Sequence, residues 1–156
     1  MDPNYYIKNI QNENKPIVFL MIGGPGSGKS TTARLLAEKL NFIYLDTGAM
    51  YRAVTFYFLK NSVNLKDSKK IYEALLEINL SIHFYDKFEI YISDKNVDKD
   101  IRSTKVNEFV SFVSQIELVR KKMVEIQRSQ SIMRRYRAFL LQQNWSSINA
   151  IIRPKN

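Results

Sequence analysis

Residues 23–30 read Gly23-Gly24-Pro25-Gly26-Ser27-Gly28-Lys29-Ser30 and match the pattern G-x-x-x-x-G-K-[ST] at every defined position. An apolar, β-branched run at 17–22 precedes this loop, and residues 30–40 follow it with the apolar spacing of a helix. Glycine lets the backbone approach a phosphate without a Cβ clash, and backbone N–H groups and the helix N-terminus then attract the anion. The pattern therefore predicts a loop that binds a nucleoside triphosphate; a glycine-rich turn that only connects strand and helix is the alternative.

Two side chains of this loop carry the expected chemistry. Lys29 is placed to reach the β- and γ-phosphates as a catalytic residue, and the hydroxyl of Ser30 is a suitable ligand for Mg²⁺. We therefore expect a nucleoside triphosphate and Mg²⁺ as cofactors. The residues expected to contact the nucleotide are Gly23, Gly24, Pro25, Gly26, Ser27, Gly28, Lys29, Ser30 and Thr31.

Outward from the loop, strands and helices alternate, which is typical of an α/β fold. A second short strand is predicted at 42–45 and a helix at 48–60, and Asp67 or Ser68 can cap a further helix. Apolar and polar side chains then alternate over 80–93, which predicts a two-stranded hairpin with one buried face. The remaining predictions are a turn at 94–96, a helix from about Thr104 and a helix from about Ile116 to at least Arg128.

The composition limits the chemistry that is available. The chain has 156 residues, of which 45% are hydrophobic and 25% charged, and this fits one ordinary domain with a packed core. Without cysteine and with His83 as its one histidine, it has no disulfides, no thiol catalysis and no Cys- or His-cluster metal site; we assign His83 no role. No apolar run approaches the roughly 18 residues of a membrane span, and no signal peptide is visible. We expect a cytoplasmic protein without a membrane partner.

The positive charge is concentrated toward the C-terminal end. The formal net charge is +9, and no acidic residue follows Glu125. A basic excess predicts anionic partners. We divide the chain into a mobile lead-in at 1–15, a core at 16–128 and an atypical basic tail at 129–156, within which residues 139–141 could continue a helix.

A second candidate site follows the predicted strand at 42–45. The run Asp46-Thr47-Gly48-Ala49-Met50-Tyr51-Arg52 lies at the carboxyl end of that strand, where α/β sheets build binding sites. Arg52 is suited to clamp a second phosphate through two parallel hydrogen bonds. Taken alone, an exposed arginine on a capped surface helix is an equal alternative.

Three runs make the chain resemble the bacterial cytidylate kinases, a family of P-loop nucleoside monophosphate kinases. They lie at 26–33, 36–40 and 42–53, and Asp-Thr-Gly-Ala-Met-Tyr-Arg at 46–52 is their specific part. The hairpin at 80–93 resembles the small β-insert of this family. The similarity continues with Asp100-Ile101-Arg102-Ser103-Thr104, Val110-Ser111, Val119-Arg120 and Ile126-Gln127-Arg128, so that it covers about 16–128.

The resemblance implies phosphoryl transfer from ATP to CMP or dCMP, with Mg²⁺, which yields ADP and CDP or dCDP. It also implies a three-layer P-loop NTPase fold with a parallel sheet and an antiparallel insert at about 62–103 that binds the nucleoside monophosphate. Carried over by position, Arg52 would be catalytic and hold the acceptor phosphate, while Arg102 would support this site. The implied CMP-binding residues are Thr47, Tyr51, Arg52, Ser111 and Arg120, of which the last two would read the cytosine edge.

The resemblance ends after Arg128. The family would next show a strand that leads into a Gly-Arg-Asp motif, but no glycine follows Gly48 here. Because that strand lies between the first two strands in this family, those two lose their shared neighbour, and two strands do not make a stable sheet. Either residues 148–152 fill the gap or the fold is incomplete at its C-terminus. The acid-free tail would fit a truncated or frameshifted reading frame, which the DNA around codon 128 would test.

Three functions stay open at the level of sequence. The first is an active cytidylate kinase that uses tail arginines in place of the family's lid, and the second is a non-catalytic fragment that still binds ATP through 23–31. The third, a basic nucleic-acid-binding module, is the weakest, because the tail lacks interleaved aromatic and basic residues. The two residues implied to read the base also have alternatives without a function. Ser111 could be an ordinary helix serine, and Arg120 could pair with Glu117. We expect a monomer whose partners are ATP, CMP and dCMP.

Overall fold

A computed structural model describes residues 17–22, 26–40, 43–84, 88–129 and 138–143. The chain forms two compact units, one made of Met1–Asp46 with Gln127–Asn156 and the other of Thr47–Ile126. The mixture of helices and strands agrees with the predicted α/β class. In the part of the chain that the structure describes, no helix is both long and apolar enough to span a membrane.

Some predictions fall on residues that are not described. They are the lead-in at 1–15, the strand proposed at 148–152, and the first part of the glycine-rich loop at 23–25.

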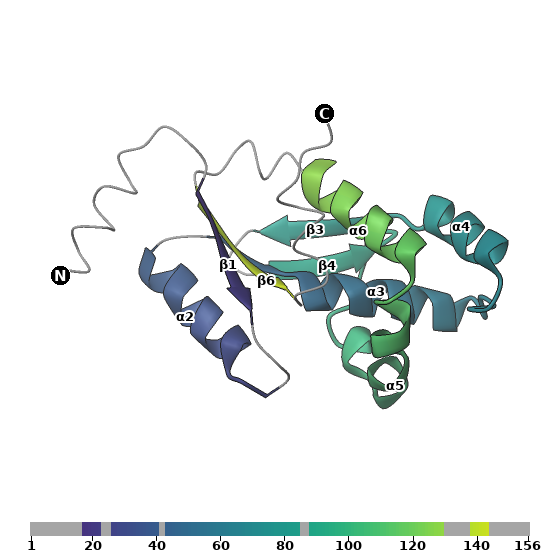
Figure 1. The fold of residues 1–156 in the computed structure, drawn as a ribbon, viewed down its shortest axis with the longest axis horizontal. Coiled ribbons are helices and arrows are strands. Elements are labelled where there is room, and N and C mark those ends of the chain that lie inside the picture. The colour runs from purple at the N-terminus through teal and green to yellow at the C-terminus, as the bar shows by residue number, and fades with distance from the viewer. Residues whose placement is uncertain (1–16, 23–25, 41–42, 85–87, 130–137, 144–156) are drawn as a thin grey trace. The chain divides into compact units, whose positions relative to one another are not determined.

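The first unit contains a parallel sheet of three described strands. β1 (Ile17–Ile22) and β2 (Ile43–Asp46) both pair with β6 (Ala138–Gln143), in the order β1-β6-β2. In Figure 1, β1 and β6 lie side by side and α2 (Lys29–Leu40) runs along the sheet. Runs such as Ile17–Ile22 form strands readily because branched side chains suit a pleated surface.

The central strand of this sheet comes from the basic tail. Leu140 of β6 lies in register between Phe19 of β1 and Tyr44 of β2. The expectation that 139–141 continue a helix is therefore wrong. β6 takes the place between the two strands, for which the sequence analysis had offered either residues 148–152 or an incomplete fold. A strand with a neighbour on each side pairs its backbone N–H and C=O groups in two ladders. The free energy of this long-range pairing outweighs the local preference of the segment for a helix.

Helix α2 packs in this unit through its small residues. Ala33 is fully buried and Ala37 nearly so, and Met21, Leu36 and Tyr44 pack against them. The two alanines are four residues apart and therefore lie on the same face of the helix. The predicted helix after the loop, with one apolar face, is confirmed.

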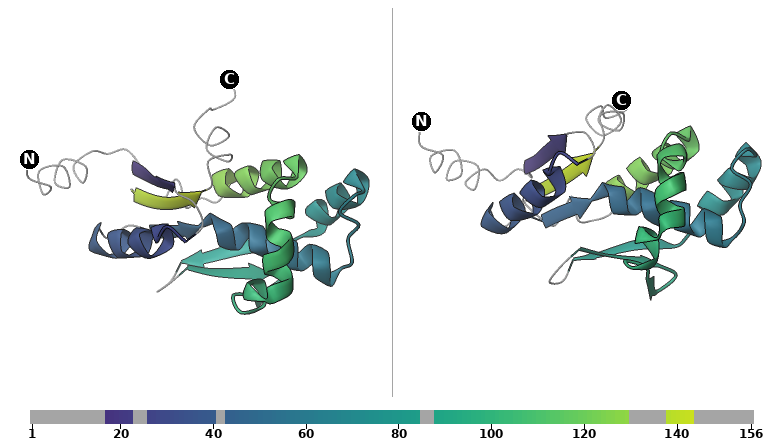
Figure 2. Two further views of the ribbon diagram at one scale, coloured as in Figure 1. Left: turned by 60° about the horizontal axis from the view of Figure 1, so that its bottom comes forward. Right: turned by 90° about the horizontal axis from the view of Figure 1, so that it is seen from below.

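The second unit holds an antiparallel sheet. β3 (Leu80–Phe84), β4 (Phe88–Ile92) and β5 (Lys95–Asn96) pair in that order, and Figure 2 shows the β3–β4 hairpin from two further sides. The predicted hairpin is confirmed. The predicted turn at 94–96 is corrected in part, because Lys95–Asn96 pairs with β4 while Ser93 and Asp94 make the turn with positive φ angles of 46° and 64°.

The helices of the second unit follow the predicted spacing. The described helices are α3 (Thr47–Lys60), α4 (Ser68–Glu77), the 3-10 helix η1 (Asp100–Arg102), α5 (Thr104–Val113) and α6 (Glu117–Ser129), whose last three residues belong to the first unit. Helix α3 contacts β4, η1 and α5, so it forms the centre of this unit. Its apolar side chains Met50, Val54 and Phe58 are at most 1% exposed, and Ile90 of β4 is fully buried.

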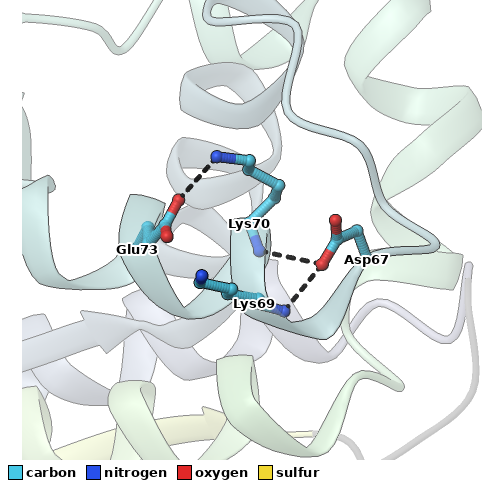
Figure 3. Close-up of polar contacts among 4 residues, drawn as sticks. All are labelled: Asp67, Lys69, Lys70 and Glu73. Atoms are coloured by element: carbon cyan, nitrogen blue, oxygen red, sulfur yellow. Dashed lines mark hydrogen bonds and ion pairs between the residues drawn. The ribbon is translucent and has the colours of Figure 1, made fainter.

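Helix α4 begins at an acidic cap, which Figure 3 shows. The Oδ1 atom of Asp67 accepts hydrogen bonds from the backbone N–H groups of Lys69 at 2.9 Å and Lys70 at 3.2 Å. The first turn of a helix leaves its N–H groups without partners inside the helix, and a carboxylate satisfies them while it also opposes the helix dipole. One turn on, the ammonium of Lys70 pairs with Glu73 at 2.9 Å.

We expect Asp67→Ala to lower the free energy of unfolding by about 1 kcal/mol, because the two N–H groups lose their acceptor. The matched control is Glu73→Ala, which removes a carboxylate of the same helix that takes part only in an exposed ion pair worth about 0–1 kcal/mol. Urea unfolding of both variants measures the difference. Equal destabilisation by the two changes would show that the cap adds nothing beyond surface charge.

Candidate nucleotide-binding site

The described part of the glycine-rich loop has the backbone that an anion-binding turn needs. Gly26 and Gly28 have φ angles of +73° and +75°, a conformation that side chains with a Cβ rarely adopt. Helix α2 starts directly afterwards at Lys29. Its first turn is fastened by Thr32, whose backbone N–H and hydroxyl both donate to the carbonyl of Gly28, at 3.0 and 3.1 Å. The N-terminal end of a helix, which attracts anions, therefore follows the loop immediately.

The candidate triphosphate residues of the described loop are accessible. Gly26, Ser27, Gly28 and Thr31 are exposed, whereas Lys29 and Ser30 are half-buried. The residues at 23–25 lie outside the described residues.

A polar cluster that the sequence analysis missed lies between α2 and β2. The guanidinium of Arg34 stands 5.4 Å from the ring centre of Tyr44 and 3.9 Å from the carboxylate of Asp46. Burial raises the pKa of Tyr44 and the nearby Asp46 adds to the rise, while Arg34 and a hydrogen bond with Ser30 oppose it. Ser30 and Arg34 are four residues apart on the helix, and Tyr44 and Asp46 two apart on the strand, so each pair shares one face. That spacing is the sequence signal that could have revealed the cluster.

The candidate acceptor residues Thr47, Tyr51 and Arg52 all lie in the first two turns of α3. Thr47 is 2% and Tyr51 8% exposed, and Arg52 is half-buried. The carbonyl of Tyr51 accepts a hydrogen bond from the hydroxyl of Thr55, one turn further along α3, at 2.8 Å. Of the three, Arg52 has the side chain most accessible to a ligand.

The acceptor arginine contacts a residue that the sequence analysis did not single out. The Nη1 atom of Arg52 donates to the Oδ1 atom of Asn107, in the first turn of α5. Ser111 lies four residues further along α5 and therefore on the same face as Asn107. The contact thus joins the predicted phosphate clamp to the helix face that carries a predicted base-reading residue. No sequence signal marks this contact, because Arg52 and Asn107 are 55 residues apart.

The two base-reading candidates lie on different helices. Ser111 is exposed on α5, and its carbonyl accepts the hydroxyl of Ser114 at 2.9 Å and the amide of Gln115 at 3.1 Å. Arg120 is half-buried on α6. Glu117, the alternative partner considered for Arg120, forms an ion pair with Lys121 at 2.7 Å, and this lowers the pKa of Glu117.

The start of α2 offers an oxygen ligand that suits a nucleotide-bound Mg²⁺. Among the described residues there is no group of three or more His, Cys, Asp or Glu side chains that could hold a metal ion by itself. The hydroxyl of Ser30, at the start of α2, is a hard oxygen ligand of the kind that Mg²⁺ accepts together with phosphate oxygens. The residues present therefore fit a nucleotide-bound Mg²⁺.

Comparison with known proteins agrees with these features. A sequence model described as cytidylate kinase matches residues 20–137. The cytidylate kinase of Fusobacterium nucleatum subsp. nucleatum is 49% identical over 112 residues, which are 71% of this chain and 50% of that protein. That of Cytophaga hutchinsonii is 44% identical over 117 residues, 73% of this chain and 50% of that protein. A bifunctional pantoate ligase/cytidylate kinase of Prochlorococcus marinus is 45% identical over 121 residues, 74% of this chain and 23% of that protein.

The chain therefore belongs to the cytidylate kinase family, whose members are nucleoside monophosphate kinases and thus phosphotransferases. This confirms the resemblance seen in the sequence. The chain spans about half the length of the curated cytidylate kinases that it matches. The family match ends at residue 137, directly before β6.

Proposed function

We propose that this chain transfers a phosphoryl group from ATP to CMP or dCMP, with Mg²⁺, and so yields ADP and CDP or dCDP. The observation that carries the proposal is the loop of Gly26 and Gly28 with positive φ, followed at once by a helix that begins with Lys29. Membership of the cytidylate kinase family supports the acceptor. The proposal also assigns the chain a three-layer P-loop NTPase fold. It further states that the protein is a monomer and acts in the cytoplasm.

On the donor side, the loop and the start of α2 bind the phosphates of ATP. Backbone N–H groups cradle the anion, and the ammonium of Lys29 neutralises charge at the β- and γ-phosphates. Mg²⁺, when bound, would supply further positive charge at the phosphate oxygens. Ser30 would hold it through its hydroxyl, and Arg34 on the same face of α2 contacts Tyr44 and Asp46 of β2.

On the acceptor side, Arg52 holds the phosphate of the nucleoside monophosphate, with Thr47 and Tyr51 of the same helix beside it in sequence. Ser111 and Arg120 contact the cytosine edge, and Arg102 supports this site. A guanidinium fits a phosphate through two parallel N–H···O bonds, which fixes the acceptor oxygen for in-line attack. The protein thus contributes position and charge rather than a covalent intermediate.

A coupled ATP-consumption assay on the 156-residue chain tests the proposal, with CMP, dCMP, UMP and AMP offered separately. We expect CMP and dCMP to stimulate ATP consumption. In the Arg52→Ala variant the KM for CMP should rise about 10- to 100-fold, because a charge-assisted contact worth about 1.5–3 kcal/mol is lost. The KM for ATP should stay within about twofold, since Arg52 acts on the acceptor.

The matched control is Lys60→Ala, which removes one positive charge from the other end of α3 and should leave both constants unchanged. If UMP or AMP stimulates ATP consumption and CMP does not, the proposed acceptor is wrong. ATP binding without stimulation by any acceptor would favour the alternative, a non-catalytic chain that binds a nucleotide through 23–31.

A further inference from the structure

Asn107 joins three elements of the second unit around the acceptor arginine. Its Oδ1 atom accepts the guanidinium of Arg52 from α3, and its amide Nδ2 donates to the carbonyl of Arg102 in η1 at 3.4 Å. Its backbone N–H donates to the carbonyl of Ser103 at 3.0 Å, which fixes the residue in the first turn of α5. Contacts of α3 with both η1 and α5 keep these three elements together. The carboxamide is thus anchored on one side and faces the guanidinium with its oxygen.

The partner of Arg52 in this contact is neutral. A carboxylate at the same place would form an ion pair and cancel much of the positive charge on the guanidinium. An amide oxygen accepts a hydrogen bond without carrying a charge, so Arg52 keeps its full charge. The contact uses the Nη1 atom of Arg52, and a guanidinium has five N–H donors in all. A fixed but still fully charged arginine suits a site that must capture a dianionic phosphate.

We infer that Asn107 is a positioning residue, which pre-orients Arg52 for the phosphate of the incoming nucleoside monophosphate. This inference rests on the proposed function, because the phosphate is that of the proposed acceptor. Asn107 and Ser111 share one face of α5, and the orientation of Arg52 therefore places the clamp beside the face that would meet the base. Because the contact already orders the long arginine side chain, less conformational entropy is lost when the ligand binds, and this favours binding.

The test measures the dissociation constant of CMP by titration calorimetry on the purified 156-residue chain and its variants. We expect Asn107→Ala to weaken CMP binding about 3- to 10-fold through loss of the positioning hydrogen bond. Asn107→Asp should weaken it about 5- to 20-fold, because the new carboxylate both pairs with Arg52 and repels the phosphate. Asn64→Asp is the control, since it makes the same change from amide to carboxylate at an exposed residue beyond the C-terminal end of α3, where the acceptor for the Lys66 N–H is kept, and it should change CMP binding less than about twofold. Urea midpoints show that each variant is folded.

A double-mutant cycle separates positioning from a purely structural role. In the Arg52→Ala background, Asn107→Ala should have no further effect on CMP binding, because its action passes through the arginine. Wild-type binding in both Asn107 variants, or additive losses in the cycle, would overturn the inference while leaving the proposed function intact. A wild-type chain that does not bind CMP would overturn the proposed acceptor, and with it the role of Asn107, before any variant is compared.

Discussion

Lys29→Ala is expected to raise the dissociation constant of ATP about 10- to 100-fold, because the triphosphate loses a charge-assisted hydrogen bond worth about 1.5–3 kcal/mol. Any CMP-dependent turnover should fall further, by about 10²- to 10³-fold, since charge stabilisation at the transferred phosphoryl group is the main catalytic contribution of such a site. Lys29 is the half-buried first residue of α2, and we expect its ammonium to act at the helix start, where backbone N–H groups also favour an anion. Calorimetric titration with Mg·ATP measures the affinity, and the coupled assay measures turnover.

The matched control is Lys39→Ala, at the opposite end of the same helix and exposed. It removes an equal charge from the chain but lies in the last turn of α2, away from the loop. Its ATP affinity should differ from that of the wild type by less than about twofold, because a charge more than a Debye length away is largely screened at physiological salt. Equal losses in the two variants would mean that ATP is attracted only by the net charge of the chain, and the loop would then not be its site.

Leu140→Pro is expected to disrupt the first unit and to abolish ATP binding. Leu140 lies in the middle of β6, in register with Phe19 on one side and Tyr44 on the other. Proline removes a ladder N–H from a strand that has neighbours on both sides and leaves a carbonyl without its donor, at a cost of about 3 kcal/mol. Because β1 and β2 are joined only through β6 in the described sheet, they lose their common neighbour. Urea unfolding followed by the ATP titration measures both effects.

The comparison variant is Ile151→Pro, which places the same residue in the segment 148–152 that the sequence analysis offered as one alternative for this strand. We expect it to leave ATP affinity unchanged within about twofold, because β6 lies at 138–143. The reverse result, with Ile151→Pro disruptive and Leu140→Pro silent, would move the central strand to 148–152. The pair of variants therefore decides which part of the basic tail completes the sheet.

Much of the second unit could be predicted because its signals are local. The i, i+4 apolar spacing predicted α3, the alternation over 80–93 predicted the hairpin, and Asp67 was identified as one of two caps for α4. Each of these patterns involves only residues that are close together in the sequence. It therefore predicts the local element without knowledge of the rest of the fold. The family resemblance was likewise readable from short runs and is confirmed by the family match at 20–137.

The contacts that shape the candidate site could not be read in this way. Arg52 and Asn107 meet across 55 residues of sequence, and Arg34 meets Asp46 between a helix and the next strand. Spacing within one element shows which residues share a face but not which face of another element they meet. The roles assigned to Thr47, Ser111 and Arg120 stay predictions, which the binding experiments above can test.

The amino-acid sequence alone was sufficient for the α/β class, the glycine-rich turn before α2 and the family, since each rests on residues that are neighbours along the chain. Glycine permits the positive φ angles that Gly26 and Gly28 adopt, which side chains with a Cβ rarely tolerate. The order β1-β6-β2 and the neutral partner of Arg52 emerged only in three dimensions. A central strand is selected by the two ladders that it completes, and the energy of those ladders depends on strands more than 90 residues away in sequence.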